Sequence, residues 1–337
     1  MNSRYLPMDL RTSPHFSKGV SVEVIMRNVI YALVPIVVFS VYSFGWSVLL
    51  LFSSTTVSCL LTEHFFNRLA SKENTLQDYS AAITGILLGL TLPPGFPLWM
   101  AGIGGFVSIA LGKVIFGGLG FNLFNPALVG RAFLQAAFPM AITTWTQPLS
   151  PDRWDRWIST TLAFPFTKSM PDVVSGATPL SAMKFDHQLT AWTDLFWGRM
   201  AGSSGETCAA LLLLGGIYLA ARKMLDWRIP IGIFGSVFLW SSFFHWIHPS
   251  YPPPLFMLFS GGLMLGGIFM ATDMVTSPVT PIGIWIYAAL IGTLVVFIRW
   301  WGGLPEGVMY AILLGNALTP LLNRLTPQKV YGFRRKQ

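Results

Sequence analysis

The sequence predicts an all-α polytopic membrane protein of about ten transmembrane helices, in two repeated halves of five with interrupted helices, plus one external polar segment. The composition is 53% hydrophobic and only 11% charged, with a mean hydropathy of +0.57, which is too apolar for an ordinary soluble domain. Apolar runs alternate with short loops that hold most of the basic residues, as in multi-pass membrane proteins. Glycines and prolines interrupt the runs at corresponding places in the two halves.

The first half contains five apolar runs, at about 28–44, 46–61, 79–92, 98–111 and 126–138. The third run ends at Pro93-Pro94-Gly95 and is shorter than the roughly 20 residues that a regular helix needs to cross the bilayer. We therefore expect a broken or tilted helix there. The glycines, asparagines and proline that precede the fifth run predict irregular backbone, which survives at membrane depth only inside protein or along a cavity.

The second half repeats this order of events, with runs at about 207–221, 229–244, 252–271, 282–298 and 307–322. A polar break at 272–278 follows its third run, and Trp301-Gly302-Gly303-Leu304-Pro305 takes the place of Phe116-Gly117-Gly118-Leu119-Gly120. The pattern indicates an internal duplication. Paired interrupted helices in duplicated halves predict a shared site between them.

Composition divides the chain into five segments. These are a cytoplasmic N-terminal segment (1–27), a first transmembrane half (28–140), an external segment (141–206), a second transmembrane half (207–322) and a basic cytoplasmic tail (323–337). Basic short loops predict that both termini are cytoplasmic and that segment 141–206 lies on the external face of the membrane, which is the periplasmic side in a host with a periplasm. The net charge of +8 is not gathered into a stripe with aromatics, so we expect the lipid bilayer and no nucleic acid as a partner.

The external segment carries the stretch Asp172-Val173-Val174-Ser175-Gly176-Ala177-Thr178-Pro179-Leu180. Gly176 and Ala177 are too small to shield the Thr178 hydroxyl from a bulky phosphate-bearing group. Pro179 disfavours a helical conformation at Thr178, which predicts an extended or turned backbone there. On these residues alone, a loop that only turns the chain is the more common interpretation.

Asp-x-x-Ser-Gly-Ala-Thr resembles the flavinylation motif of the NqrB/RnfD family, in which the threonine carries FMN through a phosphoester bond. Further stretches are similar to the same family, in the same order: KVIFGGLGFNLFNPALVGR at 113–131, GSSGET at 202–207, MATDMVTSPVTP at 270–281 and GLPEGV at 303–308. Within that family the chain resembles the D subunits of Rnf ion-translocating electron-transport complexes. NqrB subunits have a longer N-terminal extension, whereas the apolar runs begin here at about residue 28.

The resemblance implies a membrane flavoprotein subunit that is not catalytic alone, within a translocase that couples ferredoxin/NAD electron transfer to Na+ or H+ transport. FMN would be attached to Thr178, with Asp172, Ser175, Gly176 and Ala177 as recognition elements or flavin contacts, and riboflavin as a possible noncovalent second cofactor. The implied partners are the other Rnf subunits, including a second flavin-carrying subunit, and a separate flavin transferase that acts on FAD. We assign no catalytic residue, because nothing in the sequence supplies an activating set for the threonine.

Two alternatives remain at this stage. One is an NqrB-type subunit of the sodium-pumping NADH:quinone reductase. The other is a channel or transporter of urea-channel-like fold with no redox role, because duplicated halves with broken helices also build such proteins and fold alone does not decide function.

No metal site is predicted. Cys59 and Cys208 lie in apolar runs without metal-ligand spacing, so we interpret both as buried small hydrophobic residues. His245 and His248 flank Trp246 and are interpreted mainly as part of an interfacial belt.

Three charged residues have two interpretations each. Asp273, beside a predicted helix break, lines an ion route or caps a turn at the cytoplasmic surface. Lys113 and Arg131 pair with a flavin or quinone, or reach the membrane interface with their charged ends.

Overall fold

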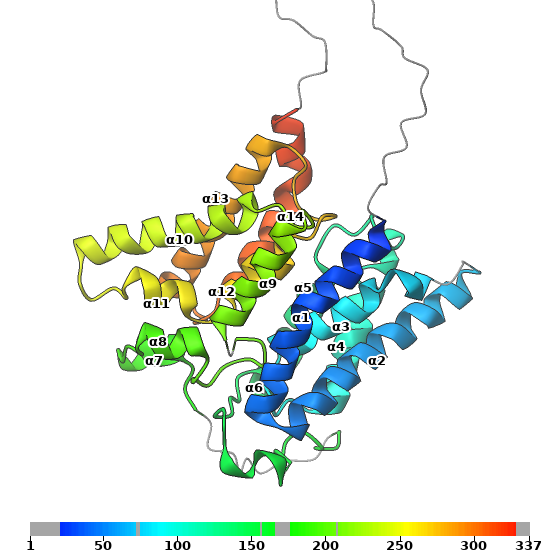
Figure 1. Cartoon of the computed structure of the whole chain (residues 1–337), viewed down its shortest axis with the longest axis horizontal. Coiled ribbons are helices and arrows are strands. Elements are labelled where there is room, and N and C mark those ends of the chain that lie inside the picture. Colours follow the sequence, from blue (N-terminus) through cyan, green and yellow to red (C-terminus); the bar gives the residue numbers. More distant parts are fainter. Residues whose placement is uncertain (1–20, 72–74, 156, 166–175, 207, 328–337) are drawn as a thin grey trace, which may run out of the picture.

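The computed structural model describes residues 21–71, 75–155, 157–165, 176–206 and 208–327, and within these ranges the chain is helical with no strands (Figure 1). Five described helical segments are long and apolar enough to cross a bilayer, and two shorter apolar helices accompany them. The long segments are α1 (Val22–Phe44), α2 (Trp46–Leu69), Leu98–Phe116, α10 (Arg228–Ile247) and α13 (Pro281–Trp301). The chain is therefore a multi-pass membrane protein; the count of ten and the division into repeats stay predictions.

The other described elements include the two shorter apolar helices, α3 (Ser80–Thr91) and α9 (Ala209–Ala221), and the helix α4 (Leu98–Ala110), which continues through η2 (Val114–Phe116). The remainder are η1 (Thr75–Asp78), α5 (Pro126–Ala137), α6 (Pro139–Ile142), η3 (Pro151–Trp154), α7 (Pro179–Asp186), α8 (Trp192–Trp197), α11 (Pro254–Phe259), α12 (Leu263–Leu265), η4 (Gly266–Met270) and α14 (Val308–Leu325).

Helices α1 and α2 extend beyond their predicted apolar runs at the end of the bundle where the described chain begins. Helix α1 starts at Val22 because the Ser21 hydroxyl accepts the Val24 N–H at 3.3 Å, and an ion pair between Glu23 and Arg27 supports its first turns. These turns are polar, and hydropathy therefore does not reveal them.

In the first half, α2 packs against α3 and α4 through residues with little or no side chain. A Cβ on Gly85 would lie 2.5 Å from Thr56 Cα. The Ser58 hydroxyl donates to the Gly102 carbonyl of α4 at 2.6 Å. Such positions let helix backbones approach closely. Helix α3 ends at Thr91, before the prolines, as predicted.

In the second half, α10 packs against α13 in the same manner, because a Cβ on Gly292 would lie 2.7 Å from the Ile233 carbonyl oxygen. The apolar run 252–271 has a further interruption that the sequence did not predict, because the structure divides it into α11, α12 and the π-helix η4. The break follows Ser260, whose successor Gly261 has a φ of 62°, a left-handed conformation that favours glycine.

The two halves meet where α1 packs against α9 and α5 packs against α14, between the blue-to-cyan and the yellow-green-to-red parts of Figure 1. Asn125 Nδ2 donates to the Met270 carbonyl at the end of η4 at 3.2 Å, and the Tyr218 hydroxyl donates to Asn28 at 2.6 Å. The described chain begins and ends toward the top of Figure 1, whereas residues 141–155 and 157–165 lie at the opposite end of the bundle, called the outer end below.

Candidate functional site

Thr178 is the N-cap residue of α7. Its backbone is extended, with φ −68° and ψ 153°, and Pro179 occupies the first helical position; the conformation predicted from Pro179 is confirmed. The hydroxyl oxygen accepts the Ser181 N–H at 3.2 Å and lies 2.9 Å from Ser181 Oγ. It therefore sits at a helix N-terminus, where backbone N–H groups and the helix dipole favour a bound phosphate.

A cavity of about 450 Å³, called the outer cavity below, opens beside Thr178. Its volume falls in the range of roughly 300–1,000 Å³ that is usual for small-molecule sites. Its walls combine two aromatic side chains with charged and small polar groups from both halves of the chain: Arg131, Gln135, Trp145, Thr178, Ser181, Phe185, Glu206 and Glu306. Aromatic surface beside a few convergent polar groups suits a flat heterocyclic ligand that carries a phosphate.

The rest of the predicted motif is only partly described. Gly176 and Ala177 line the same cavity. The Gly176 N–H donates to the Trp145 carbonyl at 3.0 Å, and a Cβ at Gly176 would lie 3.2 Å from Ala201 Cβ, so this turn has little room for a larger residue. Asp172 and Ser175 lie outside the described residues.

Helix α7 is attached to the second half by a lysine that the sequence analysis missed. Lys184 Nζ donates to the carbonyls of Arg299, Gly302 and Leu304, around the end of α13, where a cation complements the helix dipole. These acceptors lie 115 to 120 positions away along the chain, and a lone lysine in an external segment therefore gives no sequence signal for the contact.

Two buried arginines near the outer cavity donate hydrogen bonds to backbone carbonyls at the ends of helices. Arg131 is buried and donates to the Thr91 carbonyl at the end of α3, which contradicts an interfacial position. Arg299, near the outer end of α13, is 1% exposed and donates to the carbonyls of Met257 at 2.6 Å and Ser260 at 2.8 Å.

Lys113 also has a buried position. Its ammonium lies 2.6 Å from Glu63 Oε1 and 4.0 Å from Asp78 Oδ2, and the residue is 3% exposed. Interfacial placement is therefore wrong for Lys113 too: it neutralises a carboxylate on the neighbouring helix α2. Cys59 and Cys208 are free and buried, as predicted.

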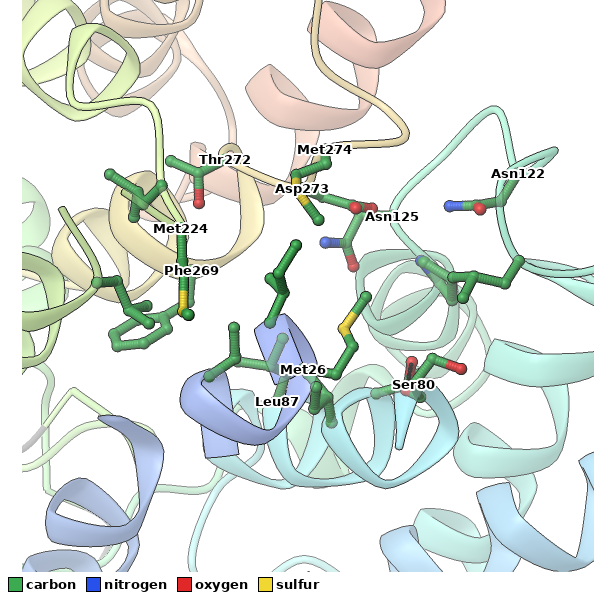
Figure 2. Close-up of a pocket in the computed structure, with 18 of the residues that line it drawn as sticks. Met26, Ser80, Leu87, Asn122, Asn125, Met224, Phe269, Thr272, Asp273 and Met274 are labelled. Carbon is green, nitrogen blue, oxygen red and sulfur yellow. Dashed lines mark hydrogen bonds between the residues drawn. The ribbon is translucent and has the colours of Figure 1, made fainter. Parts of the chain in front are cut away.

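Asp273 lies in the turn after η4, toward the end of the bundle that carries the described termini. Its carboxylate accepts the Val275 N–H at 3.2 Å and the Thr276 hydroxyl at 3.4 Å, which is the predicted turn-capping geometry. The side chain also lines an inner cavity of about 100 Å³ between the halves, with Asn125 and Ser80 nearby (Figure 2). An ion route through Asp273 stays a prediction.

Nearly the whole chain is similar to one protein family. The model of the NQR2, RnfD, RnfE family matches residues 9–332. The chain belongs to this family. It is 39% identical to the D subunit of the proton-translocating ferredoxin:NAD(+) oxidoreductase complex of Clostridium ljungdahlii, over 97% of this chain and 96% of that protein.

Other members of the family are similar over comparable lengths. The D subunit of the Na(+)-translocating ferredoxin:NAD(+) oxidoreductase complex of Acetobacterium woodii is 38% identical over 97% of this chain and 96% of that protein. The D subunit of the ion-translocating oxidoreductase complex of Alcanivorax borkumensis is 36% identical over 95% of this chain and 96% of that protein.

Proposed function

We propose that this family member is the D-type subunit of an Rnf complex, which couples ferredoxin/NAD electron transfer to Na+ or H+ transport, and that it carries electrons on FMN bound covalently to Thr178. The observation that carries the proposal is the position of the Thr178 hydroxyl, at the N-terminus of α7 and on the wall of a 450 Å³ cavity. Relatives that match over nearly their whole length are named as D subunits, which supports the Rnf type over the NqrB alternative. Relatives named for protons and for sodium are almost equally similar, so identity does not select the ion.

The residues around Thr178 fit FMN. The Ser181 N–H at the start of α7 is within hydrogen-bond distance of the attachment oxygen, and Arg131 supplies a cation to the same cavity; both favour a phosphoester anion. Trp145 and Phe185 supply aromatic surface for an isoalloxazine ring. Bound FMN would supply reversible electron transfer, while the chain holds and orients it. Maturation requires a flavin transferase with FAD as donor, because no activating base for Thr178 is among its described contacts.

The arrangement of the described helices supports an inverted repeat of five segments, in which α1 to α5 correspond to α9, α10, the broken helix α11–η4, α13 and α14. Ser58 meets Gly105 in the first half as Ser236 meets Gly292 in the second. Helices α1 and α9 run in opposite directions, since Gly215 faces Ala32 and Tyr218 reaches Asn28. Both termini are then cytoplasmic, and Thr178 faces the periplasm of a bacterial inner membrane. The surrounding partners are the bilayer and the other Rnf subunits, one of them a second flavin carrier.

The resemblance also implies a noncovalent riboflavin, and the cavity between the halves is the space to compare with it. The inner cavity of about 100 Å³ (Figure 2) is smaller than the roughly 300 Å³ at the lower end of small-molecule sites. Its residues do not fit a flavin in this conformation, and we assign no electron-transfer step to it.

The test is in-gel flavin fluorescence of the denatured chain, produced with a matching flavin transferase. Thr178→Val should abolish the fluorescence, because denaturation leaves only bonded flavin on the band. Thr143→Val, on the wall of the same cavity, is the matched control and should stay fluorescent. A dark wild-type band, with the transferase active on another substrate, would refute covalent flavin and favour a channel or transporter.

A further inference from the structure

A second, much smaller cavity lies directly beneath the outer cavity, between the two halves. Its volume is about 20 Å³, and a water molecule needs roughly 10–15 Å³, so it accommodates one water. Arg131, Glu206 and Glu306 line both this cavity and the outer one. These three side chains therefore form the partition between the ligand-sized space around Thr178 and the centre of the bundle.

The two carboxylates approach the same glycine pair at the helix break. Glu306 Oε2 accepts the Gly262 N–H at 3.0 Å. A Cβ on Gly261 would lie 2.1 Å from Glu306 Oε2, and a Cβ on Gly262 would lie 3.3 Å from Glu206 Oε1. Side chains at 261 and 262 would crowd this space, so the glycines let carboxylates from separate segments, the 202–207 stretch and the 303–308 stretch, share one location.

The two carboxylates differ in the cations and N–H donors that stabilise a negative charge on them. Glu306 has a cationic partner, Arg299 of α13, at 3.4 Å, and it also accepts two backbone N–H groups. Glu206 has no cation within ion-pair distance among the described residues, and the Ser203 N–H donates to it at a long 3.4 Å. Arg131 of α5 lines the same small cavity as both carboxylates, but its guanidinium donates to the Thr91 carbonyl. Glu206 is therefore the carboxylate with the weaker support for a negative charge.

An independent observation points to a hydrogen-bonding group inside the small cavity. Ser203 lines it and is fully buried, and its hydroxyl, beside Glu206, makes no hydrogen bond of good geometry among the described residues. Buried hydroxyls are normally paired, and one water in this cavity would pair with Ser203 beside Glu206. Surrounding protein, and next the Glu306 carboxylate, raise the pKa of Glu206, which lies outside the membrane-spanning helices, whereas Arg131 opposes the shift.

We propose that Glu206 is a proton-donating and proton-accepting site that serves the ligand of the outer cavity, with Glu306 and the small cavity behind it. In its protonated form Glu206 is a carboxylic acid, and its raised pKa extends that form to higher pH than in an ordinary glutamate. Its O–H bond breaks when a ligand atom in the outer cavity becomes basic, and the proton passes to that atom. The resulting carboxylate then takes a proton from solvent through water. For a flavin, whose ring nitrogens become basic on reduction, Glu206 would be the proton source; this last role rests on the proposed function, whereas the proton site itself does not.

The test of the proton site uses infrared spectroscopy of the Thr178→Val chain, which needs no flavin. Both the wild-type chain and the Thr178→Val chain should show a protonated-carboxyl C=O band that persists above the ordinary glutamate pKa of about 4.3. Glu206→Gln should remove this band. Asp152→Asn, an exposed carboxylate of the same segment, should leave it unchanged. If no band that depends on Glu206 persists above about pH 4.3, the proposal is overturned, whether or not Thr178 carries flavin.

A second pair of variants keeps the test decisive if Glu206→Gln fails to fold. Glu306→Gln removes a neighbouring negative charge, so the band should titrate at lower pH than in the wild type. Arg131→Gln removes a cation, so the band should persist to higher pH. A band that titrates identically in all three proteins would contradict the site. In the flavin-loaded chain, Glu206→Gln should also weaken the pH dependence of the flavin midpoint potential; flavin loading without that change would refute the proton-source role alone.

Discussion

The ion pair between Lys113 and Glu63 gives the most quantitative prediction. Both side chains are almost fully buried, at 4% and 2% exposure, and their charged atoms are 2.6 Å apart. At an effective dielectric constant of about 20, Coulomb attraction at this distance is about 6 kcal/mol, which is offset by a desolvation cost of several kcal/mol for each ion. The pair as a whole is then nearly neutral for stability. Removal of one partner leaves a buried, uncompensated charge and costs about 3–5 kcal/mol.

Lys113→Met should therefore destabilise the chain strongly, because Glu63 Oε2 already lacks a hydrogen-bond partner among the described residues. The double variant Glu63→Gln/Lys113→Met removes both charges at similar volume and should recover most of the loss. Apparent melting temperature in detergent at a fixed scan rate measures this, since membrane protein unfolding is commonly irreversible. A double variant no more stable than Lys113→Met, or a Lys113→Met chain as stable as the wild type, would refute the buried-pair argument.

Three further predictions concern the outer end. Lys184→Met removes a cation from three carbonyls around the end of α13 and should lower the free energy of unfolding by about 1–3 kcal/mol. It should also lower in-gel flavin fluorescence. Lys184→Arg should lower the fluorescence less. A residue with a Cβ loses roughly 1–2 kcal/mol in the left-handed conformation. Gly261→Ala should destabilise the chain by more than this, because the new Cβ would also meet Glu306. Gly303→Ala, with open space around it, is the control that should leave the melting temperature unchanged. Because the folded-state pKa of Glu206 is raised, the folded chain binds more protons than the unfolded chain above about pH 4.3. Stability should then fall as pH rises through the folded pKa, and Glu206→Gln should flatten this dependence of the melting temperature.

Hydropathy and backbone chemistry predicted much of the fold. The short helix α3 was expected because prolines follow Leu92 and cannot continue a helix. The extended backbone of Thr178 followed from Pro179 in the same way. Both predictions depend on residues adjacent in sequence, where local sterics decide the conformation.

The features that sequence reasoning missed depend on residues that are distant in sequence. Gly261 occurs in a run of apolar residues, and the need for a glycine there is seen only when the Glu306 carboxylate, distant in sequence, is found to fill the space beside it. Glu206 and Glu306 stand in two short stretches that were recognised as similar to the family, but nothing local indicates that they meet. An acidic residue beside glycines in each of the two stretches, 202–207 and 303–308, was the available signal.

The attachment of α7 has a mechanical consequence. Lys184 joins the helix that begins at Thr178 to the end of α13, and Leu180 packs against Gly261, whereas Arg131 on the opposite wall belongs to α5. If one half of the bundle tilts relative to the other, Thr178 travels with the second half and Arg131 with the first. The width of the outer cavity therefore depends on the relative orientation of the two halves. A group tethered at Thr178 would move with the second half. Its distance to any electron partner held by the first half would therefore change.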